Sequence, residues 1–371
     1  MSAAETETII ARVGQASQPA LSDLEYLLTL EDPREQEMLF TAADRVRKRY
    51  VGDGIFLRGL IEFSNYCVNS CHYCGLNRNN AGLERYRLSD EEILAGVTLM
   101  SSQRIRTVVL QAGEDDGIDP ESFAALVREI KGRFGISITL SLGEWPRSAY
   151  ALWREAGADR YLLKIESSDK SLYEALHTHR SFESRARCVE DLRTLGYQVG
   201  SGCMVGIRGQ TPAHLARDIL YFADRDFDMI GIGPFIPHPR TPLWDQQRGG
   251  AQMTLKAVAL TRILTRNSHL PATTALGSLE QDFRIQALKA GANVLMPNFT
   301  PVRAKKLYEI YPGKRCIEEP AGACAFCMEG LAASIGRHID YSAGDSLKGR
   351  RAAQAAGEPV GTAVESIRRP L

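Results

Sequence analysis

The stretch IFLRGLIEFSNYCVNSCHYC, residues 55–74, joins a run of apolar, β-prone residues to three closely spaced cysteines. The run at 55–64 predicts a buried strand, and Cys67, Cys71 and Cys74 follow it in a C-x3-C-x2-C pattern. Three thiols are one fewer than an ordinary structural zinc or iron–sulfur site uses. The stretch therefore raises two questions: which fold continues from this strand, and what completes the site.

Beyond this stretch, short apolar runs alternate with longer amphipathic runs. The further predicted strands are TVVLQAG (107–113), ISITLSLG (136–143), DRYLLKIES (159–167), QVGSGCMVG (198–206), DMIGIGP (228–234), PATTALG (271–277) and ANVLMP (292–297). Parallel strands need crossover connections, so eight strands that alternate with helices predict an α/β fold of the (βα)8 TIM-type barrel class. An open doubly wound sheet is the alternative, because periodicity alone does not decide closure.

The chain divides into four expected parts. Residues 1–50 have apolar residues at helical spacing and predict a helical N-terminal extension. The barrel is expected over 51–300, and a C-terminal segment with a second cysteine cluster over 301–335. Residues 336–371 are polar and rich in glycine and alanine, which predicts a mobile tail.

The bulk composition excludes some classes of protein. Lys+Arg and Asp+Glu are both 45 in 371 residues, so no basic excess favours binding to nucleic acid or an anionic membrane. We find no apolar run of about 18 residues and no secretion signal, so we expect a cytoplasmic protein. In a reducing compartment, eight cysteines indicate metal binding or catalysis before disulfides. Cys188, in a helical pattern, is expected to be a small buried side chain.

The position of the first cysteine triplet favours a catalytic site. In a parallel barrel the active site lies at the carboxyl ends of the strands, where this triplet falls. Three thiolates can hold three corners of a 4Fe–4S cluster and leave one iron with an open coordination position. The alternative is a structural zinc site completed by His72 or a remote residue.

The triplet, with the aromatic Tyr73 before its last cysteine, resembles the radical S-adenosylmethionine (radical SAM) superfamily. The resemblance implies that the open iron binds the amino and carboxylate groups of SAM. It also implies that reduction cleaves SAM to methionine and a 5′-deoxyadenosyl radical.

A narrower resemblance covers most of residues 50–330. In order along the chain it includes the motifs RGLIEFSNYC, CGLNRNN, RYRLS, VVLQAGED, TLSLGEWPR, AGADRYLL, MVGIRGQT, DFDMIGIGPFIPHP, PATTALG, GANVLMPN and LYEIYPGK. These resemble the HydE family, radical SAM maturases of the di-iron (FeFe) hydrogenase active-site cluster. Biotin synthase and methylornithine synthase are similar to that family in fold.

The resemblance implies roles for residues at the SAM site. Gly113 and Glu114 would lie at the turn that meets the SAM amino group, and Glu166 and Arg185 would contact SAM. Met204 would help to seat the adenosine part. From the residues alone, an ordinary salt bridge is the favoured interpretation of Glu166 and Arg185.

Other residues would line the substrate cavity. The hydroxyls of Thr273 and Thr274 can bind a small anion or carboxylate. Tyr308 and Tyr311 match positions that line the family's cavity, although simple core packing is an equal alternative. His238 is expected to be a structural histidine rather than a base.

Two departures from the family pattern concern substrate geometry. Lys164-Ile165 stands where many members have Arg-His, and lysine lacks the bidentate fork of arginine. Arg208 stands where a proline is common.

The second triplet, Cys316, Cys324 and Cys327, resembles an optional second iron–sulfur site of the same family. A zinc site and three free thiols are the alternatives.

The leading hypothesis is a radical SAM enzyme that acts in hydrogenase cluster assembly on a cysteine-bound Fe(CO)2CN complex. The resemblance implies three partners: a tyrosine-cleaving radical SAM maturase, a GTPase scaffold and a low-potential electron donor. One rival is a radical SAM enzyme for an amino acid or small organosulfur substrate, like methylornithine or biotin synthase. The other rival is a non-catalytic zinc- or iron-binding scaffold.

Overall fold

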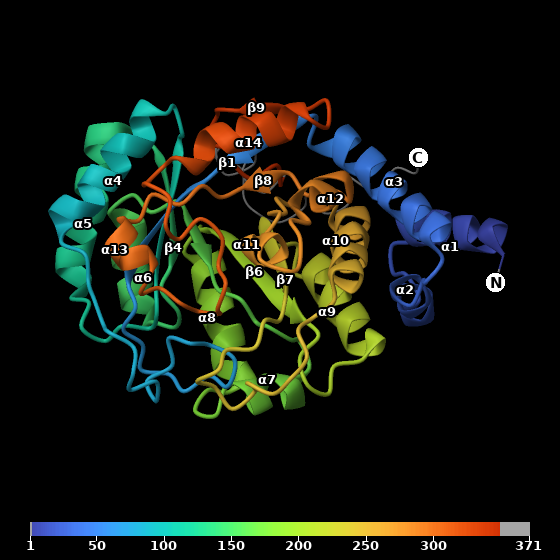
Figure 1. The fold of residues 1–371 in the computed structure, drawn as a ribbon, viewed down its shortest axis with the longest axis horizontal. Coiled ribbons are helices and arrows are strands. Elements are labelled where there is room, and N and C mark those ends of the chain that lie inside the picture. The colour runs from blue at the N-terminus through green and yellow to red at the C-terminus, as the bar shows by residue number, and fades with distance from the viewer. Residues whose placement is uncertain (1, 349–371) are drawn as a thin grey trace.

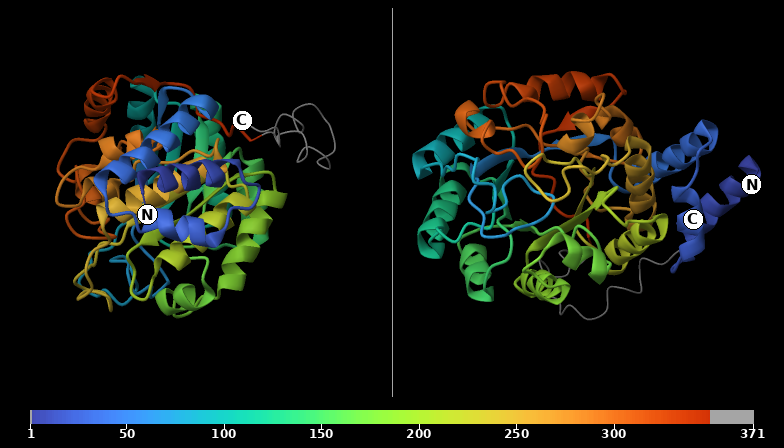
Figure 2. Two further views of the ribbon diagram at one scale, coloured as in Figure 1. Left: turned by 90° about the vertical axis from the view of Figure 1, so that its right-hand side faces the viewer. Right: turned by 60° about the horizontal axis from the view of Figure 1, so that its bottom comes forward.

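The computed structural model describes residues 2–348, in which helices surround parallel strands (Figures 1 and 2). The strands are β1 (Gly54–Leu57), β2 (Gly59–Ser64), β3 (Thr107–Ala112), β4 (Ser137–Ser141), β5 (Arg160–Leu162), β6 (Gln198–Val205), β7 (Met229–Pro234), β8 (Val294–Leu295) and β9 (His338–Asp340). The helices are α1 (Ala3–Gln15), α2 (Leu21–Leu28), α3 (Pro33–Tyr50), α4 (Asp90–Ser102), α5 (Pro120–Phe134), α6 (Arg147–Glu155), α7 (Lys170–Leu176), α8 (Phe182–Thr194), α9 (Pro212–Asp224), α10 (Ala251–Thr265), α11 (Thr274–Gly277), α12 (Arg284–Lys289), α13 (Val302–Lys305) and α14 (Cys324–Ala333).

The strands form two parallel sheets. One has six strands in the order β2-β3-β4-β5-β6-β7, and the other has the order β8-β1-β9. Neighbours in the larger sheet are consecutive in the chain and are joined through helices, as crossover connections require. Isolated parallel bridges join Leu60 to Asn298 and Pro271 to Val294. The predicted α/β class with parallel strands is therefore confirmed, whereas continuous strand pairing does not close the described strands into one sheet.

Two predicted strands differ from the structure. The run at 55–64 is divided at Arg58 into β1 and β2, and the buried Arg58 side chain reaches Met229 and the Gly344 carbonyl. The strand predicted at 271–277 is wrong, because helix α11 occupies its second half. Pro271 has no N–H to donate, so strand pairing there is limited to a single bridge.

The three N-terminal helices lie against one side of the barrel-like body, where α2 and α3 pack on α9 and α10 (Figure 2). Each buries an apolar stripe, which in α2 consists of Leu24, Leu27 and Leu28. The starts of two of them are capped: Ser2 and Glu5 form a capping box on α1, and Asp32 accepts from Arg34 N on α3. These residues are therefore helical, as the sequence predicts.

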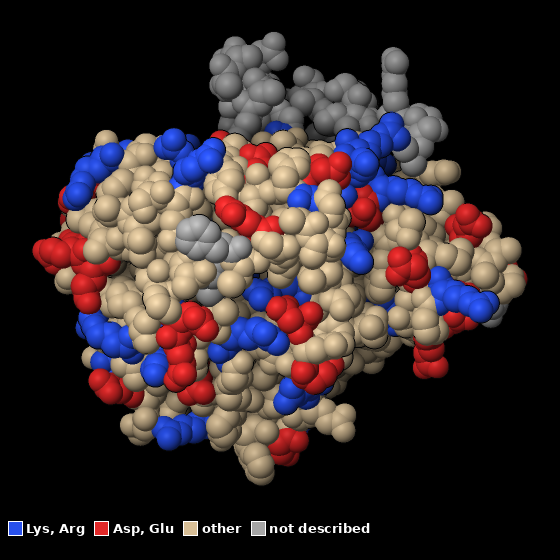
Figure 3. All heavy atoms as spheres, turned by 45° about the horizontal axis from the view of Figure 1, so that its top comes forward, with Lys and Arg blue, Asp and Glu red and all other residues tan. Residues whose placement is uncertain are grey.

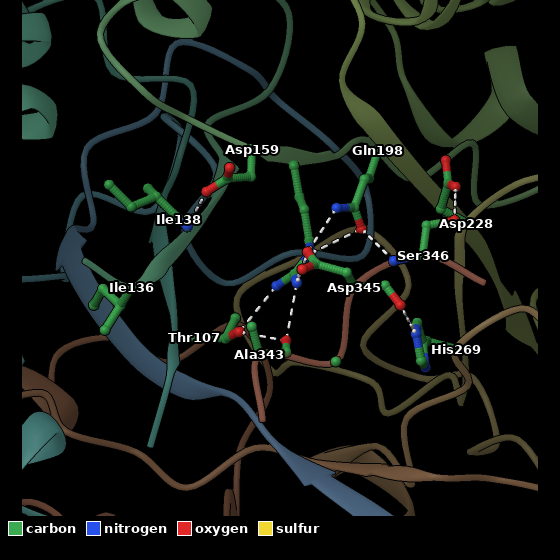
Figure 4. A network of polar contacts seen from close by, with 12 residues as sticks. Thr107, Ile136, Ile138, Asp159, Gln198, Asp228, His269, Ala343, Asp345 and Ser346 are labelled. Atoms are coloured by element: carbon green, nitrogen blue, oxygen red, sulfur yellow. Dashed lines mark hydrogen bonds and ion pairs between the residues drawn. The ribbon is translucent and has the colours of Figure 1, made fainter. Parts of the chain in front are cut away.

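The structure differs from the predicted mobile tail over residues 336–348. Strand β9 pairs in parallel with β1, and the chain then crosses the amino ends of the strands. Figure 4 shows this crossing, where Asp345 lies beside Gln198 and Ser346 beside Asp228. The remainder of the predicted tail, 349–371, lies outside the described residues.

None of the helices in residues 2–348 is both long and apolar enough to cross a membrane. On the face in Figure 3, basic and acidic side chains are intermingled rather than gathered into separate patches.

Candidate active site

The cysteine loop leaves β2 without regular secondary structure but with a fixed backbone. The Asn65 amide donates to the Glu84 and Leu307 carbonyls at 2.8 and 2.9 Å. The Arg85 guanidinium donates to the carbonyls of Asn65, Leu76 and Asn77. Because side chains satisfy these carbonyls, the loop is held in one shape without a helix or strand.

Cys67, Cys71 and Cys74 are half-buried and face one cavity of about 180 Å³. Burial raises the pKa of all three thiols, for Cys74 to about 12. Thiols in such a site lose their protons when they coordinate a metal, so this donor set fits a bound cluster better than free thiolates. Among the described side chains of residues 2–348, which exclude that of Cys324, no group of three or more cysteine, histidine or acidic side chains is arranged to hold a single metal ion.

Gly113 allows the end of β3 to approach the cysteine loop. A Cβ atom at this position would lie 2.2 Å from the Tyr66 carbonyl oxygen and 2.8 Å from the Cys67 Cβ. Both contacts are shorter than van der Waals packing allows, and one is to backbone. Only glycine therefore fits where the predicted SAM-binding turn begins.

The Glu114 carboxylate is held by protein groups around it. It accepts hydrogen bonds from Asn69 at 2.6 Å, from Arg180 at 2.6 Å and from the Glu144 backbone N–H at 2.7 Å. Asn69 belongs to the cysteine loop, and Arg180 lies between α7 and α8. Glu114 thus ties the cysteine loop to two neighbouring βα loops.

The predicted alternative of a Glu166–Arg185 salt bridge is wrong. Arg185 pairs instead with Glu144, at 2.9 Å between Nε and Oε1, and also donates to the Tyr173 hydroxyl. Lys164 Nζ lies 3.0 Å from Glu166 Oε2, but its alignment makes no hydrogen bond. Glu166 Oε2 is therefore a buried acceptor at the cavity wall without a hydrogen-bond partner.

Tyr73 is fixed by a buried histidine. His177 Nδ1 donates to the Tyr173 carbonyl at 2.9 Å, which leaves Nε2 to accept from the Tyr73 hydroxyl at 3.1 Å. Burial lowers the pKa of His177 to about 3, so the ring is neutral at physiological pH. His238 is also buried, and its Nδ1 accepts from the Arg240 backbone N–H, which agrees with a structural histidine.

A larger cavity of about 350 Å³ shares a wall with the smaller one. Lys164 and Glu166 line both cavities. Most of the predicted cofactor and substrate residues line the larger cavity: Cys67, Tyr73, Cys74, Gly113, Glu166, Met204, Thr273, Thr274, Tyr308 and Tyr311. Cys71, Glu114 and Arg185 line the smaller one. Residues from widely separated βα loops thus meet at the carboxyl ends of the strands.

Sequence reasoning missed a second Lys–Glu pair in the larger cavity. Glu62 on β2 pairs with Lys314, and the Asn298 amide donates to its other oxygen at 2.9 Å. Lys314 Nζ also lies 5.2 Å from the centre of the Tyr308 ring. A single acidic residue inside the otherwise apolar run GLIEFS was the available signal, because an unpaired charge is costly in a buried strand.

Cys316 and Cys327 of the second cysteine triplet line neither cavity. Cys316 is half-buried and has a positive φ of 60°, whereas Cys327 is exposed on α14. The Cys324 side chain lies outside the described part of the structure.

Comparison with known proteins agrees with this geometry. The radical SAM superfamily matches residues 61–222. The chain is 48% identical over 314 residues to the FeFe hydrogenase maturase subunit HydE of Thermotoga maritima, which covers 85% of this chain and 90% of that protein. It is 32% identical over 275 residues to 3-methylornithine synthase of Methanosarcina acetivorans, covering 74% and 77%.

Solved structures agree in fold. A crystal structure of methylornithine synthase (PylB) has a TM-score of 0.78 at 27% identity and covers 90% of this chain and 97% of that one. The maturase HydG has a TM-score of 0.79 at 18% identity, with coverage of 97% and 82%, which bears on the fold alone. The resemblance read from the motifs is thereby confirmed, and the chain belongs to the HydE family of the radical SAM superfamily.

Proposed function

We propose that this enzyme reductively cleaves SAM in assembly of the di-iron subsite of the FeFe hydrogenase active site. The observation that carries the proposal is that the three cysteines and the Glu166 carboxylate, whose Oε2 has no hydrogen-bond partner, line one cavity in a chain that is 48% identical to HydE. A 4Fe–4S cluster bound by Cys67, Cys71 and Cys74 would supply the electron that breaks the sulfonium bond.

The protein's own contribution is binding and orientation. Glu166 is placed to accept hydrogen bonds from SAM, and the backbone at Gly113 and Glu114 lies at the edge of the same cavity. Arg185 pairs with Glu144 through Nε and forms part of the cavity wall. Its remaining guanidinium N–H groups would be the donors for a carboxylate of SAM. Met204 offers an apolar surface for the adenosine part.

The fold supports a closed (βα)8 barrel around this cavity. Isolated parallel bridges continue from β7 to the following segment at Met229–His269, from there to β8 at Pro271–Val294, and from β2 to Asn298. Ligand sites in such barrels lie at the carboxyl ends of the strands, as these residues do.

The substrate we propose is the cysteine-bound Fe(CO)2CN complex, held in the larger cavity. Thr273 Oγ1 is buried there without a hydrogen-bond partner, and Tyr308 and Tyr311 line the same wall. A small anionic complex suits hydroxyl donors in a mostly apolar cavity. Its delivery and further processing would involve a tyrosine-cleaving radical SAM maturase and a GTPase scaffold in the cytoplasm, with a low-potential electron donor.

An amino-acid substrate is the second candidate. It is favoured by the 32% identity to 3-methylornithine synthase and by Lys164, which replaces the arginine common in the HydE pattern. For the second cysteine triplet we propose an iron–sulfur site that SAM cleavage does not require.

Anaerobic reconstitution tests the proposal. With iron fully loaded and dithionite as reductant, we expect the protein to form 5′-deoxyadenosine from SAM. If no 5′-deoxyadenosine forms, the proposal that this protein cleaves SAM is wrong. The substrate is tested by maturation of apo-hydrogenase with the other maturases present and this protein added last. Restored hydrogen evolution supports the iron complex, whereas formation of 3-methylornithine from an amino acid without maturation would favour the second candidate.

A further inference from the structure

The backbone at Glu166 is held in an unfavourable conformation. Its φ is +58°, and the Ser167 N–H donates to the Ile165 carbonyl at 2.7 Å, so Glu166 is the central residue of a γ-turn. A γ-turn with positive φ is rare and strained for a residue with a side chain. Strain of this kind persists only where surrounding contacts hold the turn, and it gathers at functional sites.

Strand β6 holds one side of this turn. Glu166 N donates to the Gly202 carbonyl at 3.0 Å, and Met204 N donates to the Glu166 carbonyl at 3.2 Å. These bonds fix the backbone of Glu166 in line with the sheet. They do not fix the residues that follow it, where the chain turns away toward α7.

Those following residues are held by Asp218 from helix α9. Its Oδ1 accepts from the Ser168 N–H at 2.5 Å, from the Ser168 hydroxyl at 2.6 Å and, more weakly, from the Ser167 hydroxyl at 3.4 Å. Asp218 and Ser167 are fully buried. All the hydrogen bonds that Asp218 accepts in the described structure therefore come from the two residues after Glu166.

Packing alone does not explain an aspartate at this position. Asp218 Oδ2 is buried without a hydrogen-bond partner, and burial raises the pKa of Asp218 to about 7. Asp169, the one charged side chain among the main influences on this pKa, is itself acidic and raises it further. An apolar side chain would avoid the cost of a buried carboxylate without a counter-ion. What it could not do is accept from three donors in one tight turn.

We propose that Asp218 is a positioning residue that holds the strained turn so that the Glu166 carboxylate faces SAM. The proposal rests on the proposed function, because it takes Glu166 as a SAM-binding group. Asp218 does not line either cavity, so any effect on SAM must pass through the turn.

A double-mutant cycle on SAM affinity tests this role. Cluster-loaded Asp218→Ala, Glu166→Ala and the double variant are compared with the unsubstituted protein by equilibrium dialysis of radiolabelled SAM, without reductant. We expect each single substitution to weaken SAM binding about tenfold, since each removes a charge-assisted hydrogen bond or its alignment. We expect the double variant to match Glu166→Ala, because Asp218 then has nothing left to position.

Two further variants separate positioning from stability. Asp218→Asn keeps an acceptor oxygen for Ser168 and should bind SAM within about threefold of the unsubstituted protein. The matched control is Asp228→Ala, which removes another buried aspartate that accepts from a backbone N–H, here Val199 at 2.8 Å, but at the amino end of the strands. It should lower the melting temperature and leave SAM affinity unchanged.

The outcomes are distinct. Additive losses in the double variant, or unchanged SAM affinity in Asp218→Ala, would overturn the positioning role. Unchanged affinity in Glu166→Ala would overturn it as well, while SAM cleavage by the unsubstituted protein would leave the proposed function standing. Should Asp218→Ala fail to fold, Ser168→Ala, which removes one donor to Asp218, carries the same cycle against Glu166→Ala.

Discussion

The buried polar groups at the two ends of the parallel strands differ in how completely their hydrogen bonds are satisfied. At the amino end, Arg160 is fully buried and donates to Gln198, Thr107, the Ala343 carbonyl and Asp345, all at 2.8–3.0 Å (Figure 4 shows these partners). At the carboxyl end, Glu166 Oε2 and Thr273 Oγ1 are buried without hydrogen-bond partners.

The difference indicates that the two ends of the strands have different functions. A satisfied polar network at low dielectric stabilises one arrangement of the chain, whereas an unsatisfied one is costly unless a ligand completes it. Arg58 Nε, and Gln103 Oε1 just before β3, are exceptions at the amino end, since both are buried without a hydrogen-bond partner in residues 2–348. The amino end is therefore the stabilising end, and the carboxyl end is where ligands are expected.

The largest expected effect is at the carboxyl end. Cys71→Ala should abolish both stable cluster binding and SAM cleavage, because two thiols hold a cubane poorly. Iron content and 5′-deoxyadenosine formation measure this. Cys327→Ala, a thiol substitution in the second triplet, is the control and should retain SAM cleavage. Full activity in the Cys71 variant would contradict the site assignment.

The next largest effect is expected at the amino end. Arg160→Ala leaves Gln198, Thr107 and Ala343 without their donor and should lower the free energy of unfolding by about 2–4 kcal/mol. SAM cleavage by the folded fraction should be unchanged. Denaturant unfolding measures the first quantity, with Arg133→Ala as the matched control because its pair with Glu129 is exposed. A loss of SAM affinity without a loss of stability would contradict the assignment of a stabilising role to the amino end.

The smallest effect is expected at Asp345, the partner of Arg160. Its side chain is 59% exposed, so water screens the ion pair, and Asp345→Ala should cost about 1 kcal/mol or less. Asp345→Asn should cost less still, since it keeps an acceptor for Arg160 and Gln198. Thermal unfolding of both variants tests the order. A cost near that of Arg160→Ala would mean that residues 341–348 contribute more through Asp345 than its exposure allows.

Much of the fold was predictable because local patterns carry it. Alternating apolar and amphipathic runs predicted the α/β class, and the cysteine spacing with its flanking motifs predicted the family, which the relationship to HydE confirms. The prediction of a strand at 271–277 was wrong because a proline followed by two threonines is equally compatible with the start of a short helix. The segment at 336–348 was missed because its partners lie far away in sequence, as Arg160 does for Asp345.

The candidate site was predictable in composition but not in pairing. Every predicted SAM and substrate residue outside the second triplet lines one of the two cavities. Their individual roles stay predictions. The partner of Arg185 could not be read from the chain, since Glu144 and Glu166 were both available acids and only the fold brought Glu144 within 2.9 Å.

The sequence by itself determined the chemistry: three cysteines spaced for one cluster, on a loop after the first strand of an α/β fold. Residue type and short spacing decide those features, because they act within a few positions along the chain. Only the tertiary structure decided which side chains pair with one another. Asp218 meets Ser168, and Lys314 meets Glu62, through contacts that no local pattern encodes. Burial and distance set the energies of these contacts, and both exist only once the chain has folded.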